Sequence, residues 1–284
     1  LRLQAYASRT GTRRNLAALR VAGWGLFVSA AGVHRHEGFR FWIENGAWSW
    51  WRKGLPFQPA PFETLLKLHA HDPLCEAIVA LDIVCGGRES LTLTLSWLDR
   101  LLELGPRVYI PVQPGIPPAE IAARLGARVG VLVGGDSAWK EETAAFWARL
   151  AHERGALCHV GRVNTARRLA ICQAAHVDSF DGSGPSRFEQ ALHEMEAARA
   201  VFVQVGLVLL VCVELYADSQ SGGWVVSVDV AFAAAAIVLA AIASGYEGPV
   251  LEIQTDSGIH RCIGDGFRFD TWEELMEMEA SGTH

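Results

Sequence analysis

Val177-Asp178-Ser179-Phe180-Asp181-Gly182 is the stretch that decides the fold. It predicts a short apolar strand with two carboxylates, followed by a Gly/Ser/Pro turn and by Arg187, which we expect to open a helix. Gly161-Arg162-Val163-Asn164-Thr165 precedes it at the distance that one βα unit requires. Carboxylates at the carboxyl ends of strands carry the chemistry of (β/α)8 barrels, so Asp181 is a candidate catalytic residue.

Outward from this unit, the first 200 residues alternate between short apolar runs and helical patterns. Alternation of this kind implies parallel strands joined by right-handed crossovers. The expected strands are 3–8, 24–30, 40–44, 77–82, 107–112, 129–133, 157–161 and 177–180. The expected helices are 12–22, 88–104, 117–125, 138–154, 165–175 and 187–199. Eight strands fit a closed (β/α)8 TIM-like barrel over residues 1–200, and a doubly wound open sheet is the alternative.

Residues 45–76 do not fit a minimal βα unit, and we expect an irregular, aromatic-rich insertion after the third strand. Long loops after barrel strands form the rim of a site. Two roles are open for Trp48, Trp50 and Trp51, which either stack a nucleobase or pack the loop against the barrel.

Two almost wholly apolar runs follow residue 200, at 201–217 and 224–243. Their lengths are borderline against the roughly 20 residues that a membrane helix needs. A membrane hairpin across 201–243 is therefore one interpretation. Glu214 and Asp229 would be costly in lipid, which favours an extension of buried elements over 201–244. A small acidic α+β module is expected over 245–284, with strands around 249–254 and 259–263 and a helix at 271–279.

Charge is polarised along the chain. The net charge is −6, but residues 1–53 hold nine Lys and Arg against Glu37 and Glu44 alone. Such a chain can present a basic face to a polyanion while staying acidic overall. The alternative is an arginine-rich helix face that is simply solvated.

The six cysteines are scattered without a C-x-x-C pair or histidines at zinc-finger spacing. This pattern predicts reduced thiols, a cytoplasmic protein and no structural zinc. The first residues lack the apolar run of a secretory signal. His34, His36 and His159 show no partners at metal spacing, and we expect core or surface roles for them.

The Asp181 stretch with its following Pro185-Ser186-Arg187 resembles the nucleophile segment of the tRNA-guanine transglycosylases, a Phe-Asp-Cys with a Pro-Thr-Arg behind it. Five further segments resemble family motifs in the family's order. They are Glu44-Asn45-Gly46-Ala47-Trp48-Ser49, Leu81-Asp82-Ile83 with Ser96-Trp97, Pro111-Val112-Gln113-Pro114-Gly115, Val133-Gly134-Gly135 and Val160-Gly161-Arg162-Val163-Asn164-Thr165.

The resemblance implies a base exchange in which Asp181 attacks C1′ of the sugar, expels guanine and forms a covalent glycosyl–aspartate. Glu44 stands where the family has aspartate and would move protons on the two bases. The implied substrate-binding residues are Asp82, Gln113, Gly134, Gly135, Asn45 and Trp48. Two simpler roles stay open, with Asp82 as a helix N-cap and Gln113 satisfying loop backbone. No metal and no cofactor is expected.

The tRNA enzymes of this family carry a cysteine-rich zinc subdomain, and nothing after residue 187 offers such ligands. The chain is more similar to the phage and bacterial branch that places a 7-deazaguanine in DNA. We therefore expect DNA, or tRNA, and a free 7-deazapurine base as partners, with helper proteins for DNA opening possible. Candidate phosphate contacts are Arg9, Arg13, Arg14, Arg162, Arg167, Arg168 and Arg187. The alternatives are a non-catalytic nucleic-acid-binding or membrane-tethered barrel, and a nucleoside hydrolase.

Overall fold

The computed structural model describes residues 3–9 and 12–199, and the backbone of two strands at 250–255 and 258–263. The chain divides into two compact units, Leu1–Ala200 and Val201–His284. The apolar runs expected at 201–243 and the helix expected at 271–279 lie outside the described residues, as does the expected boundary between 244 and 245. In the part of the chain that the structure describes, no helix has the length and apolar character to cross a membrane.

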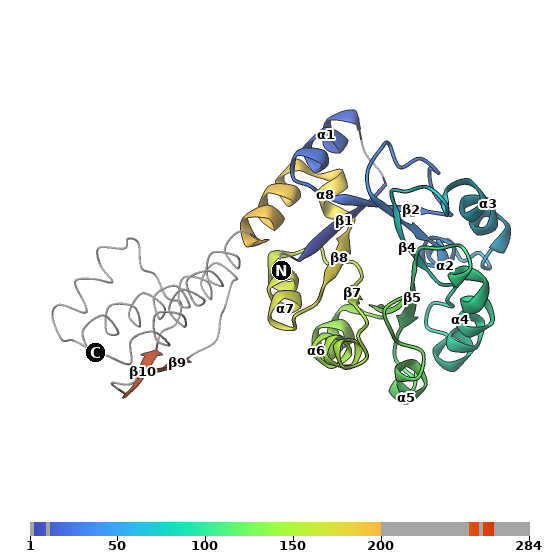
Figure 1. The fold of residues 1–284 in the computed structure, drawn as a ribbon. Coiled ribbons are helices and arrows are strands. Elements are labelled where there is room, and N and C mark those ends of the chain that lie inside the picture. The colour runs from blue at the N-terminus through green and yellow to red at the C-terminus, as the bar shows by residue number, and fades with distance from the viewer. Residues whose placement is uncertain (1–2, 10–11, 200–249, 256–257, 264–284) are drawn as a thin grey trace, which may run out of the picture. The chain divides into compact units, whose positions relative to one another are not determined.

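The first unit is a closed barrel of eight parallel strands in sequential order, drawn at the centre of Figure 1. Pairing of β1 with β8, from Gln4↔Ser179 to Ala7↔Gly182, closes the ring and rules out the open sheet. The expected (β/α)8 barrel is thus confirmed. Its strands are β1 (Gln4–Ser8), β2 (Gly25–Ser29), β3 (Phe41–Glu44), β4 (Cys75–Val79), β5 (Arg107–Val112), β6 (Val129–Val133), β7 (Cys158–Val160) and β8 (Ser179–Gly182).

Helices surround the strands, as Figure 1 shows. Three of them begin at a side-chain cap, because Thr12, Asp136 and Thr165 each accept a hydrogen bond from a backbone N–H three residues on. The helices that follow the strands are α1 (Arg13–Val21), α4 (Gly87–Leu102), α5 (Pro118–Ala122), α6 (Ser137–Glu153), α7 (Ala166–Ala174) and α8 (Gly184–Arg187).

Two local expectations are wrong. Residues 45–76 are not irregular but form α2 (Ala47–Arg52) and α3 (Pro59–His69). In α3, proline occupies the first turn and Phe62, Leu65 and Leu66 bury one face. Arg187 ends α8 rather than opening a helix, because Phe188 is extended and a separate helical segment begins at residue 189.

The crossover from β2 to β3 departs from that of a regular barrel. Residues 30–40 connect these strands without a helix, so β3 is followed by two helices while β2 is followed by none. Parallel strands are normally joined through a helix, which satisfies the backbone of the connection internally. This crossover therefore depends on side-chain contacts to hold its course.

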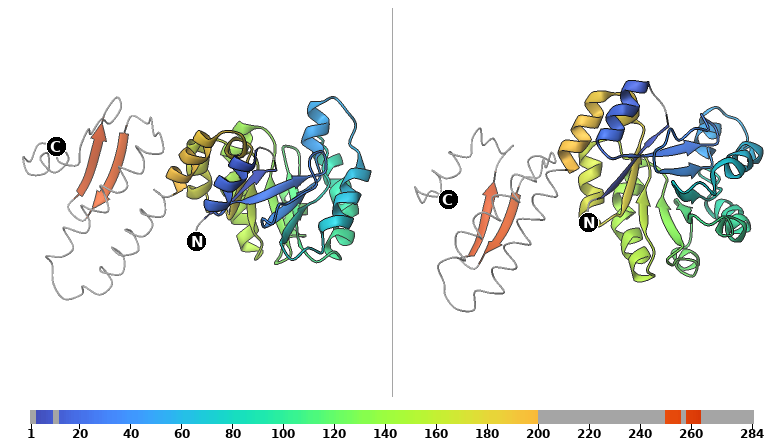
Figure 2. Two further views of the ribbon diagram at one scale, coloured as in Figure 1. Left: turned by 90° about the horizontal axis from the view of Figure 1, so that it is seen from above. Right: turned by 45° about the horizontal axis from the view of Figure 1, so that its top comes forward.

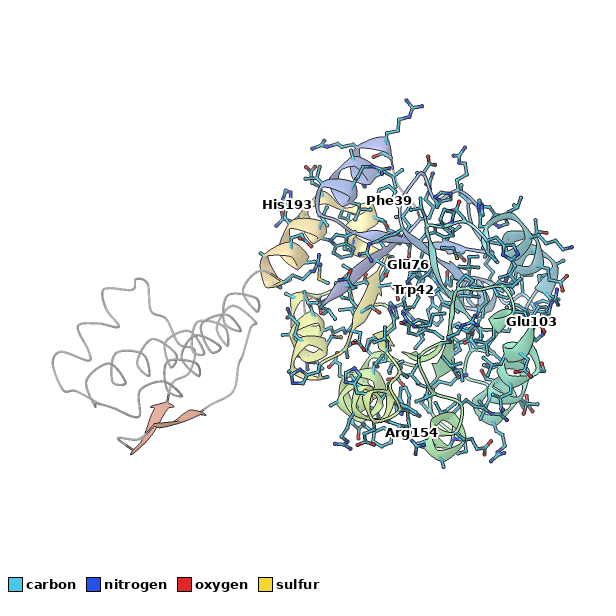
Figure 3. All side chains as sticks on the ribbon, in the orientation of Figure 1. Phe39, Trp42, Glu76, Glu103, Arg154 and His193 are labelled. Carbon is cyan, nitrogen blue, oxygen red and sulfur yellow. The ribbon has the colours of Figure 1, made fainter. Side chains whose placement is uncertain are left out.

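Aromatic side chains fill the barrel. Tyr6, Phe27, Trp42 and Tyr109 form an interior cluster that is distinct from the aliphatic layer under the helices. The Trp42 ring lies 5.0 Å from that of Tyr6 and 4.2 Å from that of Tyr109, between ring centroids. Figure 3 labels Trp42 within the ring of strands. The interior is thus a packed core, and chemistry is confined to its ends.

In the second unit, β9 (Val250–Thr255) and β10 (Gly258–Ile263) form an antiparallel pair, seen as two arrows in Figure 2. These strands agree with the two expected around 249–254 and 259–263. The register runs from Gly258↔Thr255 to Ile263↔Val250, which is that of a hairpin.

Replacing Trp42 by alanine should lower the free energy of unfolding by about 3–5 kcal/mol, because the cavity left in the barrel cannot collapse. Trp42 is 3% exposed. Trp51 is 50% exposed and provides the matched control, whose replacement by alanine should cost less than about 1 kcal/mol. Urea unfolding followed by circular dichroism measures both. Equal losses for the two variants would contradict an interior that is packed around Trp42.

Candidate active site

Carboxyl groups from three strands meet at the carboxyl-terminal end of the barrel. Glu44 ends β3, Asp82 follows β4, and Asp181 lies in β8. The negative charges of Asp181 and Asp82 both act on the Glu44 carboxyl group. Three acids that are 38 and 99 residues apart along the chain are thus brought to one mouth, as the sequence interpretation requires.

Asp181 is held through one oxygen. Its Oδ1 accepts a hydrogen bond from the backbone N–H of Arg162 at 3.1 Å and lies 3.2 Å from Nε2 of His159. Among the described residues, none makes a hydrogen bond to Oδ2. The side chain is only 12% exposed. A carboxylate with one anchored oxygen and one free oxygen is oriented for attack on an electrophile.

The loop between β7 and α7 is tied to β8 around this carboxylate. Val163 N–H donates to the backbone oxygen of Asp181 at 2.6 Å. The Asn164 side-chain oxygen accepts from the N–H groups of Ser183 and Gly184. At Gly182 a Cβ atom would lie 2.5 Å from the Val163 carbonyl oxygen, so only glycine fits. The stretches 161–165 and 177–182 are therefore joined, through these contacts, in one hydrogen-bonded unit.

His159 completes the anchor and was missed as a site residue. It is fully buried, and burial lowers the pKa of its imidazole, while the hydrogen bond and charge of Asp181 act in the opposite direction. Its Nδ1 lies 2.9 Å from the Ser179 hydroxyl, and its ring stacks on Phe27 at 5.2 Å between centroids. With Nδ1 accepting from Ser179, the Nε2 hydrogen points at Asp181. The expected core role holds, but the side chain also orients the candidate nucleophile.

Lys140 is a second residue that sequence reasoning missed. It lies in α6, is 5% exposed, and its Nζ donates to the Gly161 backbone oxygen at 2.6 Å. Burial lowers the pKa of the amine to about 8, while the charge of Asp181 acts in the opposite direction. A buried cation near Asp181 offsets part of the cost of removing that carboxylate from water.

The other two acids hold protons more tightly than free carboxyl groups do. Burial, with the charge of Asp181 next, raises the pKa of Glu44 to about 7, and the hydrogen bond from Ser29 only partly opposes this. Burial raises the pKa of Asp82 to about 6, against a hydrogen bond from Asn45. Near neutral pH, Glu44 can therefore donate a proton while Asp82 is largely ionised.

Asn45 positions Asp82 and uses both hydrogens of its amide within the protein. Its Nδ2 donates to Asp82 Oδ1 at 2.8 Å and to the Ala80 oxygen at 2.6 Å, and its Oδ1 accepts from Ala47 N–H. The substrate contact expected for Asn45 stays a prediction. Asp82 is not a helix cap, because α4 begins after Gly86.

Gln113 supports a loop. Its Oε1 accepts from Cys85 N–H at 2.8 Å, and its Nε2 donates to the Ile83 oxygen at 2.7 Å. The simpler of its two expected roles, satisfying loop backbone, describes this geometry, and the reading of a purine edge stays a prediction. Gly134 and Gly135 form the turn before α6, where Gly135 adopts φ +79 and faces the Trp139 ring.

Trp48 lies beside the mouth and carries a cation on its face. The Arg162 guanidinium is 3.8 Å from the centre of the Trp48 ring, and Trp51 stacks on Trp48 at 4.9 Å between centroids. Arg162 adopts φ 59, in the left-handed region that non-glycine residues rarely occupy. The backbone N–H and the side chain of Arg162 therefore link Asp181 to an aromatic platform at the rim.

Most of the other candidate phosphate contacts are paired with acids. Arg9 pairs with Glu37 and Arg14 with Glu189. Arg167 and Arg168 both pair with Glu141. Arg13 and Arg187 are exposed. Four of these six arginines are therefore paired with the chain's own acids.

Comparison with known proteins gives similarity to solved structures alone. No protein-family model and no curated protein matches the chain. A structure described as native KDPGal covers 72% of this chain and 96% of its own at 13% identity, with a TM-score of 0.46. The tryptophan synthase A-subunit from Pyrococcus furiosus covers 69% and 95% at 9% identity, with a TM-score of 0.38. Neither of these two descriptions names a transglycosylase.

Replacing Glu44 by glutamine should stabilise the protein at alkaline pH. The folded protein binds this proton more tightly than the unfolded chain, whose ordinary pKa is 4.5, so its contribution to stability is lost as pH rises towards 7. Glu44→Gln should therefore raise the free energy of unfolding by roughly 1–3 kcal/mol at pH 8 and leave it nearly unchanged at pH 4. Denaturant unfolding at the two pH values measures the difference.

Glu103, labelled in Figure 3 and exposed at the end of α4, gives the control. Glu103→Gln should shift stability by less than about 0.5 kcal/mol at either pH. A Glu44→Gln variant that is less stable than the parent at pH 8 would contradict the raised pKa.

Proposed function

We propose that this barrel is an enzyme that transfers a glycosyl group at a nucleotide, exchanging guanine for a 7-deazapurine through a covalent ester at Asp181. The observation that carries the proposal is the pairing of an anchored carboxylate, Asp181, with a carboxyl group whose pKa is about 7, Glu44. Two neighbouring carboxyl groups with different environments divide the roles of nucleophile and proton donor in glycosyl transfer.

In the first half-reaction, Oδ2 of Asp181 forms a bond to C1′ of the sugar. The bond from C1′ to the base nitrogen breaks, and its electron pair leaves with the base. Glu44 gives its proton to the departing base, which leaves as a neutral molecule. The products are a glycosyl–aspartate ester, free guanine and an ionised Glu44.

In the second half-reaction, the incoming base gives a proton to Glu44, and its nitrogen attacks C1′ from the face opposite Asp181. The ester bond breaks and its electron pair returns to Asp181. Two inversions retain the configuration at C1′. Both carboxyl groups end in their starting protonation states, so the cycle is balanced without a cofactor.

Asp82 supports recognition of guanine in this proposal. Above pH 6 its carboxylate is ionised and can accept from the two adjacent N–H groups of the guanine edge. The hydrogen bond from Asn45 fixes the orientation of this carboxylate. A purine without those donors would leave Asp82 unsatisfied, which gives discrimination against adenine.

The polymer proposed as substrate is DNA, or alternatively tRNA, in keeping with the sequence resemblance. The Trp48 and Arg162 pair supplies a stacking face and a positive charge beside Asp181. A target base in a duplex must leave the stack to reach this mouth. The exposed Arg13 and Arg187 are available for phosphate contacts.

One observation favours a nucleoside hydrolase as the second candidate. Four of the seven candidate arginines are paired with acids, which weakens the basic surface that a polymer would bind. In that reaction water takes the place of the incoming base in the second half-reaction, and the carboxyl pair has the same roles. A free nucleoside would then suffice as substrate.

The test uses radiolabelled guanine in DNA, in tRNA and in free guanosine and deoxyguanosine. Each substrate is incubated both with and without an added 7-deazapurine. We expect the intact chain to release guanine from one polymer repeatedly when the deazapurine is present, and no more than one guanine per chain when it is absent. Asp181→Asn should reduce release by more than about 1,000-fold, because the nucleophile is lost. Release from the free nucleosides without a second base would support the hydrolase instead.

Asp178 provides the matched control on the same strand segment. Its carboxylate accepts from Cys158 N–H at 2.7 Å and contacts His152, away from the mouth. Asp178→Asn should leave the release rate within a few-fold of the parent. Activity that survives in Asp181→Asn, or the absence of release by a folded parent protein from every substrate, would contradict the proposal.

A further inference from the structure

The helix-less crossover between β2 and β3 is held by histidines. His34 Nε2 lies 3.1 Å from the Ala30 backbone oxygen. His69, the last residue of α3, has its Nε2 2.9 Å from the His34 backbone oxygen. The His36 ring stacks on Phe41, the first residue of β3, at 4.6 Å between centroids. Imidazoles from the crossover and from α3 therefore converge where the crossover enters β3.

His36, His69 and Asp72 bring three ligand-type atoms together at this place. His36 Nε2 lies 3.2 Å from Asp72 Oδ2, and one ligand atom from each residue lies within 4.8 Å of the other two. A tetrahedral zinc ion with bonds of about 2.0–2.1 Å holds its ligands about 3.3–3.4 Å apart. The His36–Asp72 pair already has nearly this spacing, and the remaining separations, all within 4.8 Å, would close by at most about 1.4 Å around an ion.

The surrounding hydrogen bonds leave the right atoms for a cation. The His34 carbonyl takes the Nε2 hydrogen of His69, so Nδ1 of that ring keeps its lone pair. Asp72 Oδ1 accepts from Leu74 N–H at 2.8 Å, which leaves Oδ2 for a metal bond. A backbone carbonyl on the far nitrogen is the partner that metal-binding histidines use to fix their tautomer.

One contact must open for binding. Gly38 N–H points at His36 Nδ1 at 3.2 Å, whereas a neutral imidazole that binds a metal through Nε2 carries its hydrogen on Nδ1. Gly38 lies in an exposed turn with φ +73, and its contact is long for a hydrogen bond. Glu37, which follows His36 in the chain, pairs with Arg9 at 2.6 Å.

We propose that His36, His69 and Asp72 bind one divalent transition-metal cation of the zinc class, with water completing the coordination. All three residues are partly exposed, so the ion can enter from solvent. Two imidazoles and a carboxylate are a donor set that suits Zn²⁺. The expectation that the chain binds no metal rested on spacing along the sequence. His69 and Asp72 follow His36 by 33 and 36 residues, so the three residues meet only in the fold.

The site is structural and separate from the candidate active site. His36 packs on the first residue of β3, and Asp72 precedes β4. At the opposite ends of these strands, Glu44 ends β3 and Asp82 follows β4. The amino-terminal face of such a barrel serves stability rather than chemistry. A cation here would fasten the crossover 30–40 to the turn before β4, in place of the missing helix.

The test strips the full chain with a chelator and then adds Zn²⁺ or Co²⁺ alone. We expect calorimetry to show one Zn²⁺ per chain, the melting temperature to rise by several degrees, and Co²⁺ to give the intense visible absorption of a tetrahedral N/O site. Asp72→Asn and His36→Gln should each weaken binding by at least about tenfold and abolish the shift in melting temperature.

His71 lies in the same turn, is exposed, and gives the matched control. His71→Ala should bind Zn²⁺ and Co²⁺ as the parent does. A folded parent chain that shows neither a melting shift nor a Co²⁺ spectrum would overturn the proposal. So would equal binding by His71→Ala and Asp72→Asn, since the ion would then lie elsewhere. Neither result depends on base exchange, so the two proposals fail separately.

Discussion

The structure depends on keeping a buried carboxylate, Asp181, charged and correctly aimed at the end of the barrel. An unpaired buried charge would cost several kcal/mol, and the chain offsets this with donors from two neighbouring elements. Arg162 N–H and His159 meet one oxygen, and Lys140 adds positive charge behind the loop. Gly182 lets the β7–α7 loop approach closely enough to do this.

This anchor explains how one mouth can hold three acids. Hydrogen-bond donors and cations stabilise Asp181. Burial and the neighbouring negative charges disfavour the ionised form of Glu44. The environments therefore separate the acids into a group suited to attack and a group suited to hold a proton. Asp82 lies between these cases, with a single amide donor from Asn45.

The fold was largely predictable because local patterns and global topology agree. All eight strands lie within three residues of their expected bounds, and short apolar runs between helical patterns were enough to place them. The helices α2 and α3 were not foreseen, because tryptophans and prolines obscure the apolar face of Phe62, Leu65 and Leu66. The separate turn at α8 depends on the backbone of Phe188, which the helical pattern of 187–199 conceals.

The three acids of the site could be predicted from the sequence, but the groups that contact them could not. Asp181, Glu44 and Asp82 could be placed because strand ends meet at one face. The roles of Asn45 and Gln113 depend on which backbone groups of other loops face them, which no spacing reveals. Sequence patterns assigned His159 only a core or surface role and singled out nothing about Lys140, because strand register and helix docking decide what they touch.

Mass spectrometry of a quenched reaction tests the central claim most directly. The intact chain is incubated with guanine-containing DNA or tRNA without an incoming base, denatured rapidly and digested. The account predicts that the sugar that has lost guanine, with the polymer still attached to it, is bound to the peptide that contains Asp181. The bond should be to the Asp181 carboxylate. Guanine release with an adduct on Glu44 or Asp82, or with no adduct at any quench time, would contradict it.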